Sequence, residues 1–250
     1  MKRFNFYVVL FFTSLLFISC NSDSEEELID RVPKPISTSA NKILILGASR
    51  VEGARPDYES FRYELWKDLV ENELTFDFIG GETDYASYPE FMGLTFDPDH
   101  EGRGGWTSGQ ILEGLPDWLA EIEVPDIVLF SSPGGNDALN SMPYDDAIVN
   151  INATLDVLQA QNPNVLIFIE QMAPAHSDSM DATLTSYITR YHEDILSMAT
   201  TKTTINSQVI PINMYTGFTD SMLADDVHYN TTGAQFIADR YYTVLAGVLQ

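Results

Sequence analysis

Cysteine is almost absent from this chain of 250 residues, since Cys20 is the only one. One cysteine excludes an intrachain disulfide and any metal site built from several cysteines. Basic residues are also few, with 13 Lys and Arg against 37 Asp and Glu and a formal net charge of -24. A surface this acidic repels a nucleic-acid backbone or an anionic lipid surface. We therefore expect a core held by packing alone and no nucleic-acid partner.

The remaining composition is that of a globular domain with a full core. Hydrophobic residues make up 44% of the chain and aromatic residues 12%. These fractions and the chain length are typical of one domain, and no internal repeat or second apolar core is evident. Nothing in the sequence indicates an oligomeric state.

Residues 1–20 have the three-part layout of an export signal. Lys2 and Arg3 precede the apolar run 6–18, and Cys20 follows it. The run is short for a transmembrane anchor, which is the competing interpretation. The end of this segment resembles a bacterial lipoprotein lipobox. That resemblance implies cleavage before Cys20 and lipidation of this residue.

Residues 21–41 are polar, with an acidic stretch followed by serine and proline. Such a composition is typical of a solvated tether. An acidic stretch directly after the lipidated cysteine resembles the surface-export signals of Bacteroidetes lipoproteins. We therefore expect an exported domain that is attached to the outer membrane only through its lipid anchor. Either a periplasmic or an outward-facing orientation fits the residues.

Short apolar runs alternate with helical periodicity in the rest of the chain. The pattern predicts strands at 43–46, 76–79, 127–130, 165–169 and 209–210, and helices at 60–73, 107–122, 144–161, 183–198 and 231–248. Strands that alternate with helices favour a doubly wound parallel sheet with helices on both faces. The prediction for residues 42–250 is a single three-layer α/β/α domain with a five-stranded parallel sheet.

An irregular segment at 82–101 contains several aromatic residues among Pro and Asp, namely Tyr85, Tyr88, Phe91 and Phe96. A long aromatic loop in a compact domain often shapes a binding surface. The same residues could instead cover an edge of the sheet, and the sequence allows both interpretations.

Ser49 follows the first predicted strand after Gly47 and Ala48. In a parallel sheet this position lies at the carboxyl edge, where open α/β proteins bind their ligands. The serine is either a helix N-cap or a nucleophile. The chain lacks a Gly-x-Ser-x-Gly elbow around Ser49, which argues against an α/β-hydrolase.

Three further loops at the same edge carry groups suited to acyl transfer. Gly105 lies in a glycine-rich turn that opens a helix, where free N–H groups favour an anion. Asn136 follows the third predicted strand and offers a neutral amide donor. Asp225 stands three residues before His228, so its carboxylate can orient the imidazole. Asp226 is the rival acid, but its spacing points it elsewhere.

Together these blocks resemble the SGNH (GDSL-type) hydrolases, a family named for its Ser, Gly, Asn and His blocks. The resemblance spans residues 42 to about 248 and depends most on 134–137 and on Asp225-x-x-His228. Within the family, segments 101–107 and 61–66 look most like carbohydrate acetylesterases of the acetylxylan-esterase type. The family resemblance implies a flavodoxin-like arrangement of the sheet.

The resemblance also implies the catalytic roles. Ser49 is the expected nucleophile, His228 the general base and Asp225 its orienting acid. The oxyanion is expected to bind the N–H groups of Ser49 and Gly105 and the amide of Asn136.

Neighbouring residues are candidates for substrate binding, namely Arg50, Trp106 and Asp137. The acidic cluster at 97–101 is expected in a chain this acidic, so we assign no metal. The resemblance implies no cofactor.

The first block departs from the family pattern, since Gly47-Ala48-Ser49 stands where Gly-Asp-Ser is usual. The expected function is a lipid-anchored serine esterase that removes acetyl or other short acyl groups from carbohydrate or another small ester. Because of Ala48, one alternative is a catalytically weak, carbohydrate-binding lipoprotein of the same fold. A lipase or thioesterase on longer acyl chains is another, although the sequence shows no exposed apolar lid.

Overall fold

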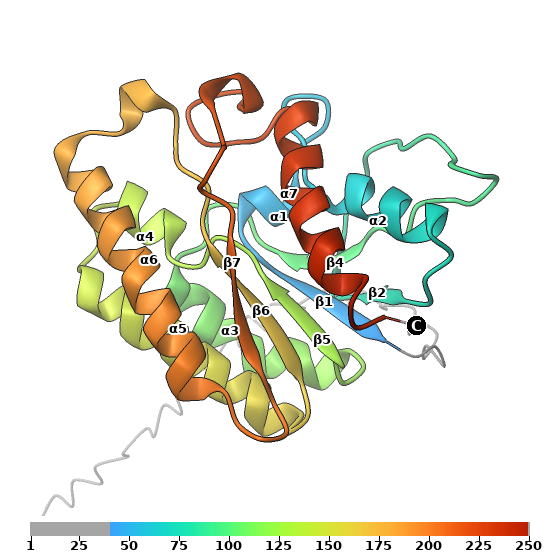
Figure 1. Ribbon diagram of the computed structural model, residues 1–250, viewed down its shortest axis with the longest axis horizontal. Coiled ribbons are helices and arrows are strands. Elements are labelled where there is room, and N and C mark those ends of the chain that lie inside the picture. Colours follow the sequence, from blue (N-terminus) through green and yellow to red (C-terminus); the bar gives the residue numbers. More distant parts are fainter. Residues whose placement is uncertain (1–40, 250) are drawn as a thin grey trace, which may run out of the picture. The chain divides into compact units, whose positions relative to one another are not determined.

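The computed structural model describes residues 41–249 (Figure 1). The predicted signal segment 1–20, the lipidation at Cys20 and the tether up to residue 40 lie outside the described residues. Within residues 41–249, none of the helices combines the length and apolar character needed to cross a membrane.

A seven-stranded sheet forms the centre of the described residues. Its strands are β1 (Lys42–Gly47), β2 (Asp77–Ile79), β3 (Glu82–Thr83), β4 (Asp99–Gly102), β5 (Ile127–Phe130), β6 (Leu166–Gln171) and β7 (Val209–Asn213). The strand order is β3-β4-β1-β5-β6-β7, and β2 also pairs with β1. The described pairs are parallel apart from β3–β4. The predicted α/β class is confirmed, whereas the prediction of five strands, all parallel, was wrong.

Strand β4 was missed because its sequence, Asp-His-Glu-Gly, contains no apolar run. Buried polar contacts hold it instead. The Glu101 carboxylate accepts hydrogen bonds from the Gly81 N–H at 2.8 Å and from the Arg103 guanidinium at 2.6 Å. β2 pairs with the first half of β1, and β4 pairs with its last two residues. The segment expected to be irregular therefore extends the sheet toward the end of β1.

Helices cover both faces of this sheet. They are α1 (Ser49–Glu52), α2 (Arg62–Glu71), α3 (Ser108–Glu121), α4 (Gly135–Leu139), α5 (Tyr144–Gln161), α6 (Ala182–Lys202) and α7 (Thr231–Leu245), with short 3-10 helices η1 (Ser177–Ser179) and η2 (Asp220–Met222). α2 and α7 pack on one face, and α3, α5 and α6 pack on the other (Figure 1). The predicted three-layer arrangement is confirmed.

β1 is shared by the two cores that lie on either side of the sheet. Ile43 and Ile45 pack against α2 and α7, while Leu44 and Leu46 face α3 and α5. All four side chains have no exposed surface. Full burial of such a side chain contributes about 1.5–3 kcal/mol, so β1 is a rigid base for the residues that follow it.

The aromatic segment before β4 is mainly a packing element. Tyr88 and Phe96 pack on Tyr63, and Phe91 contacts Trp66, which is only 4% exposed. Tyr85 is instead 99% exposed. Three of the four aromatic residues thus pack against side chains of α2.

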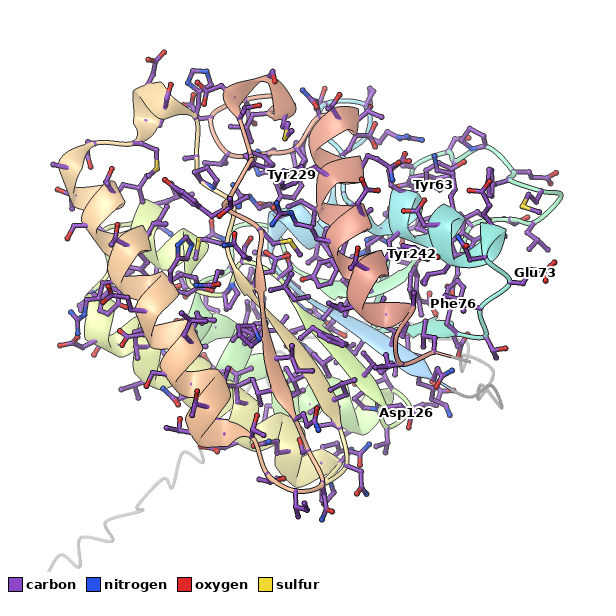
Figure 2. All side chains as sticks on the ribbon, viewed as in Figure 1. Tyr63, Glu73, Phe76, Asp126, Tyr229 and Tyr242 are labelled. Atoms are coloured by element: carbon purple, nitrogen blue, oxygen red, sulfur yellow. The ribbon has the colours of Figure 1, made fainter. Side chains whose placement is uncertain are left out.

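The ends of the strands define two opposite edges of the sheet. Asp126, directly before β5, lies at one edge, and Tyr229, two residues before α7, lies at the other (Figure 2). Tyr229 follows His228 in the chain, so the edge marked by Tyr229 is the carboxyl edge that carries the predicted site.

Candidate active site

The turn after β1 can be made only with a glycine. A Cβ atom built on Gly47 would lie 2.7 Å from Val51 Cγ2 and 2.8 Å from the Ser131 carbonyl oxygen. Real Cβ atoms do not approach backbone oxygen this closely. The absence of a side chain lets the chain turn directly from β1 into α1 and place Ser49 at the edge of the sheet.

Ser49 is the first residue of α1, and Ala48 is its N-cap. The Ala48 carbonyl accepts the N–H groups of Val51 and Glu52, both at 2.9 Å, and no side chain caps the helix. The Ser49 hydroxyl therefore does not serve as the N-cap. It is hydrogen-bonded to His228 instead, with Oγ 2.9 Å from Nε2.

Asp225 holds the other side of the same imidazole. Its Oδ2 lies 2.7 Å from His228 Nδ1, while its Oδ1 accepts the backbone N–H groups of Val227 and His228 at 2.8 and 2.7 Å. A charged carboxylate only accepts hydrogen bonds, so Nδ1 carries the proton and Nε2 accepts the Ser49 hydroxyl. Within residues 41–249, the carboxylate that contacts the His228 ring is that of Asp225 and not that of Asp226.

The surroundings of Asp225 favour its charged form. Burial raises the pKa of this carboxyl, but the hydrogen bonds from the His228 side chain and from the backbone of His228 and Val227 outweigh it, so the pKa is lowered. The side chain is 51% exposed, so water also reaches the carboxylate. The carboxylate is thus available to stabilise a protonated imidazole.

Tyr58 stacks on the His228 ring, with centroids 3.9 Å apart and planes inclined by 14°. This contact restrains the tilt of the imidazole between its two hydrogen bonds. Burial and the nearby charges of Glu52, Asp225 and Asp57 raise the pKa of Tyr58, so its hydroxyl stays protonated. The sequence gives no signal for this contact because Tyr58 lies in a turn 170 positions before His228.

Arg50 joins the nucleophile helix to the loops around it. Its Nε donates to the Val227 carbonyl at 2.9 Å, and its Nη1 donates to the Ala173 carbonyl at 2.9 Å and to Ser132 Oγ at 3.3 Å. Its Nη2 donates to the Pro174 carbonyl at 3.1 Å. The predicted substrate-binding residue is therefore largely engaged within the protein, where it fixes the residue before His228.

Glu170, at the end of β6, lies fully buried beneath this arginine. Its carboxylate accepts the Tyr241 hydroxyl at 2.7 Å, the Ser132 N–H at 2.8 Å and Ser132 Oγ at 3.0 Å. Burial raises the pKa of Glu170, while these hydrogen bonds and the charge of Arg50 oppose the change. Sequence reasoning overlooked this group, although an acid that directly ends an apolar run was a usable signal.

Asn136 reaches the same edge from the start of α4. Gly134 precedes this helix with φ +78°, a conformation that favours glycine. The Asn136 side-chain amide donates to the Trp106 carbonyl at 2.8 Å. An amide nitrogen carries two N–H groups, so the second remains for a ligand.

The other predicted oxyanion donor lies in the turn between β4 and α3. Gly105 is exposed there, with φ +78°. Within residues 41–249, it does not belong to the residues that line the cavity beside Ser49. Its N–H contribution to an oxyanion site stays a prediction.

Two further candidates serve the structure rather than a substrate. Asp137 is 3% exposed, and its two oxygens accept the Ser108 N–H and Oγ–H, each at 2.7 Å. This carboxylate fixes the start of α3 and is not available to a ligand, so the substrate-binding prediction for it is corrected. The Trp106 ring packs 5.4 Å from the Trp118 ring and does not line the cavity; its carbonyl orients Asn136.

A cavity of about 60 Å³ opens beside Ser49. Residues from α1, α4, α6 and the loops after β5 and β6 line it, namely Ala48, Ser49, Arg50, Ser132, Gly135, Asn136, Ala138, Leu139, Met172, Ala173, Ala175, Leu184, Ile188 and Val227. The hydroxyl that is bonded to the imidazole thus faces a ligand-sized space together with the Asn136 amide.

Comparison with known proteins gave matches among solved structures. No family model and no curated protein matches the chain. A carbohydrate esterase family 3 from Talaromyces cellulolyticus is 30% identical, with a TM-score of 0.70 over 84% of this chain and 98% of that one. A mutant acetyl esterase with an acetate ion has the same identity, TM-score and coverage. A Clostridium thermocellum family 3 carbohydrate esterase is 26% identical, with a TM-score of 0.67 over 84% and 98% of the two chains.

The match to the Talaromyces esterase covers nearly the whole of that protein. In this chain, Ser49, Asn136 and His228 come together at one edge of a mostly parallel sheet. The chain therefore belongs to the SGNH (GDSL-type) hydrolases and is a carboxylic ester hydrolase similar to the esterases of carbohydrate esterase family 3.

Proposed function

We propose that this esterase removes acetyl or other short acyl groups from carbohydrate through a Ser-His-Asp triad. The observation that carries the proposal is the chain of hydrogen bonds from Ser49 to His228 to Asp225, at 2.9 and 2.7 Å. The proposed carbohydrate substrate is supported by the two similar structures described as family 3 carbohydrate esterases.

The reaction begins with attack of Ser49 Oγ on the ester carbonyl carbon while His228 Nε2 takes the hydroxyl proton. The Asp225 carboxylate stabilises the imidazolium that forms. As the tetrahedral intermediate collapses, the C–O bond to the sugar breaks and the imidazolium returns its proton to the leaving oxygen. Water then attacks the acyl-serine with the same base, releasing the acid and restoring Ser49.

Negative charge develops on the carbonyl oxygen during both steps. The Ser49 N–H at the start of α1 and the second N–H of the Asn136 amide are the proposed donors, with Gly105 as a third. Neutral, fixed donors stabilise an oxyanion without titrating. Removal of one such donor typically raises the barrier by roughly 3 kcal/mol.

The alternative of a binding protein without catalysis depends on Ala48. Ala48 supplies its backbone carbonyl as the cap of α1, and the hydrogen bonds of Ser49 and His228 are in place beside it. These contacts support an active esterase rather than an inactive relative of the same fold.

The test is hydrolysis of p-nitrophenyl acetate and of acetylated xylan by the full chain. Ser49→Ala should lower kcat by at least ~10⁴-fold, because the nucleophile is removed while the fold remains. Ser87→Ala, at an exposed position, is the matched control and should leave kcat unchanged. Hydrolysis that survives in Ser49→Ala would contradict the triad. Release of acetate from p-nitrophenyl acetate but none from acetylated xylan would contradict xylan as the carbohydrate substrate.

A further inference from the structure

The cavity beside Ser49 is apolar in most of its lining. Leu184 and Ile188 of α6 face it, and Met172, Ala173 and Ala175 reach it from the segment after β6. Around the nucleophile, the polar groups of the lining are already engaged. Arg50 donates to backbone carbonyls, and the Asn136 amide is the proposed oxyanion donor.

Only one part of an acylated sugar suits such a space. Sugar hydroxyls need hydrogen-bond partners, and burial of a hydroxyl without a partner is unfavourable by several kcal/mol. The acyl chain needs none and gains free energy from burial. An apolar cavity of about 150 Å³ holds the six carbon atoms of benzene, so a volume of about 60 Å³ accommodates about two or three carbon atoms. An acetyl ester attacked by Ser49 places only its methyl carbon there, whereas propionyl and butyryl esters place two and three carbon atoms.

Ala48 contributes to the same wall. A carboxylate at this position would lose hydration beside an acyl chain without gaining a partner. The methyl side chain of Ala48 instead continues the apolar surface up to Ser49. The residue at position 48 therefore influences which acyl group the cavity accepts.

A larger space lies beyond the cavity, along α4, the start of α5 and α6. It has a volume of about 760 Å³, and Ala138, Leu139 and Leu184 line both spaces. These three residues therefore lie between the cavity and the larger space. Leu184 is fixed at the start of α6, because its backbone N–H donates to the N-cap carboxylate of Asp181 at 2.8 Å.

We propose that the cavity beside Ser49 is an acyl pocket that selects propionyl and butyryl esters over acetyl esters. Leu139 and Leu184 close its far end and set the upper limit of chain length. This inference rests on the proposed function, since it assigns the acyl group attacked by Ser49. The esterase would then act on carbohydrate or other alcohols that carry short acyl chains longer than acetate.

The experiment compares p-nitrophenyl acetate, butyrate and octanoate, in which the alcohol is constant. In the unmodified protein, kcat/KM for butyrate should exceed that for acetate by roughly 10-fold, because one methylene in an apolar pocket already changes specificity by about that factor or more. Octanoate should be hydrolysed poorly. Ratios within one variant cancel any loss of folded protein.

Leu184 variants test the end wall in both directions. Leu184→Ala joins the pocket to the larger space and should raise the octanoate-to-butyrate ratio by roughly 10-fold, whereas Leu184→Trp should lower the butyrate-to-acetate ratio by a similar factor. Ala48→Asp should also shift the preference toward acetate. Leu196→Trp, on the exposed side of α6, is the control and should leave each ratio unchanged.

Two results overturn the acyl pocket while leaving the triad intact. One is a preference for acetate in the unmodified protein, and the other is an equal effect of the Leu184 variants on all three esters. Hydrolysis that is unaffected by Ser49→Ala overturns the proposed function as well, so the two failures are distinguishable.

Discussion

Two acidic residues near the nucleophile show opposite behaviour. Asp225 lies in the loop before α7 with its side chain 51% exposed, and its pKa is lowered. Glu170, the penultimate residue of β6, has no exposed surface, and its pKa is raised. Each carboxylate accepts three hydrogen bonds from its neighbours. The difference between the two therefore comes from burial rather than from the number of partners.

The comparison separates chemistry from scaffold in this site. Asp225 remains charged near water and can stabilise an imidazolium as it forms. Glu170 binds Ser132 after β5 and Tyr241 of α7, so it joins strand ends to a helix. Arg50 links the two regions because it donates to Ser132 Oγ and to the Val227 carbonyl.

Of the residues in this comparison, Asp225 should show the largest effect when it is replaced, as Asp225→Asn. The amide can keep a bond to the loop backbone, but it favours the wrong imidazole tautomer, so kcat should fall by about 10³–10⁴-fold. Thermal unfolding should change little because the position is half exposed. Initial rates on p-nitrophenyl butyrate and a melting curve check both points. Asp226→Asn is the matched control with unchanged kcat; a larger loss in that variant would reverse the assignment.

Glu170→Gln should chiefly affect stability. The new amide N–H₂ group is a donor, and it would point at the donor groups of Ser132 or Tyr241. The free energy of unfolding should therefore fall by about 2–4 kcal/mol. Urea unfolding of this variant, beside Glu113→Gln at an exposed site on α3, measures the effect. A loss equal to that of the control would show that the buried carboxyl does not hold the strand ends together.

The same variant should show a pH dependence of defined sign. The pKa of Glu170 is raised in the folded protein, so its protonated form is favoured on folding and this contribution is lost as pH rises through the folded pKa. The stability difference between the unmodified protein and Glu170→Gln should thus be larger at low pH than at high pH. A stability difference that grows with pH would contradict a raised pKa for the buried Glu170 carboxyl.

The smallest effect is expected for Arg50→Lys. This substitution tests the link between the two regions, because Arg50 contacts both. An ammonium group cannot reproduce the fork that donates to several carbonyls. The loop before His228 should lose alignment, lowering kcat by roughly 10-fold with little change in KM. Arg190→Lys, a surface pair with Asp145, serves as the control. A change confined to KM would instead indicate direct substrate binding by Arg50.

Most elements could be predicted because their signals are local. The run 127–130 and the helix 144–161 were found residue for residue, as apolar side chains at periods of two or 3.6 residues reveal buried faces. β4 was missed because its buried residues, His100 and Glu101, are polar. The burial of Glu101 is compensated by contacts with Gly81 and Arg103, and His100 Nδ1 accepts the Gly102 N–H at 2.9 Å; no periodicity in the sequence shows these contacts.

The candidate site divides in the same way. The spacing of Asp225 and His228 predicted their pairing because three residues in a turn can close one hydrogen bond. The strand end alone left Ser49 as either a helix N-cap or a nucleophile, and the three other loops made it the expected nucleophile. Asp137 was placed at the substrate although it is buried against Ser108. Tyr58 and Glu170 were not found at all.

The sequence by itself determined most of the strands and helices and the local acid–imidazole pair, since each depends on neighbours in the chain. Only the tertiary structure decided that Ser49 meets His228 across 179 positions and that Ala48 lines an apolar cavity. Such contacts depend on strand order and on the packing of side chains from distant segments. These are properties of the assembled sheet, and no single stretch of residues specifies them.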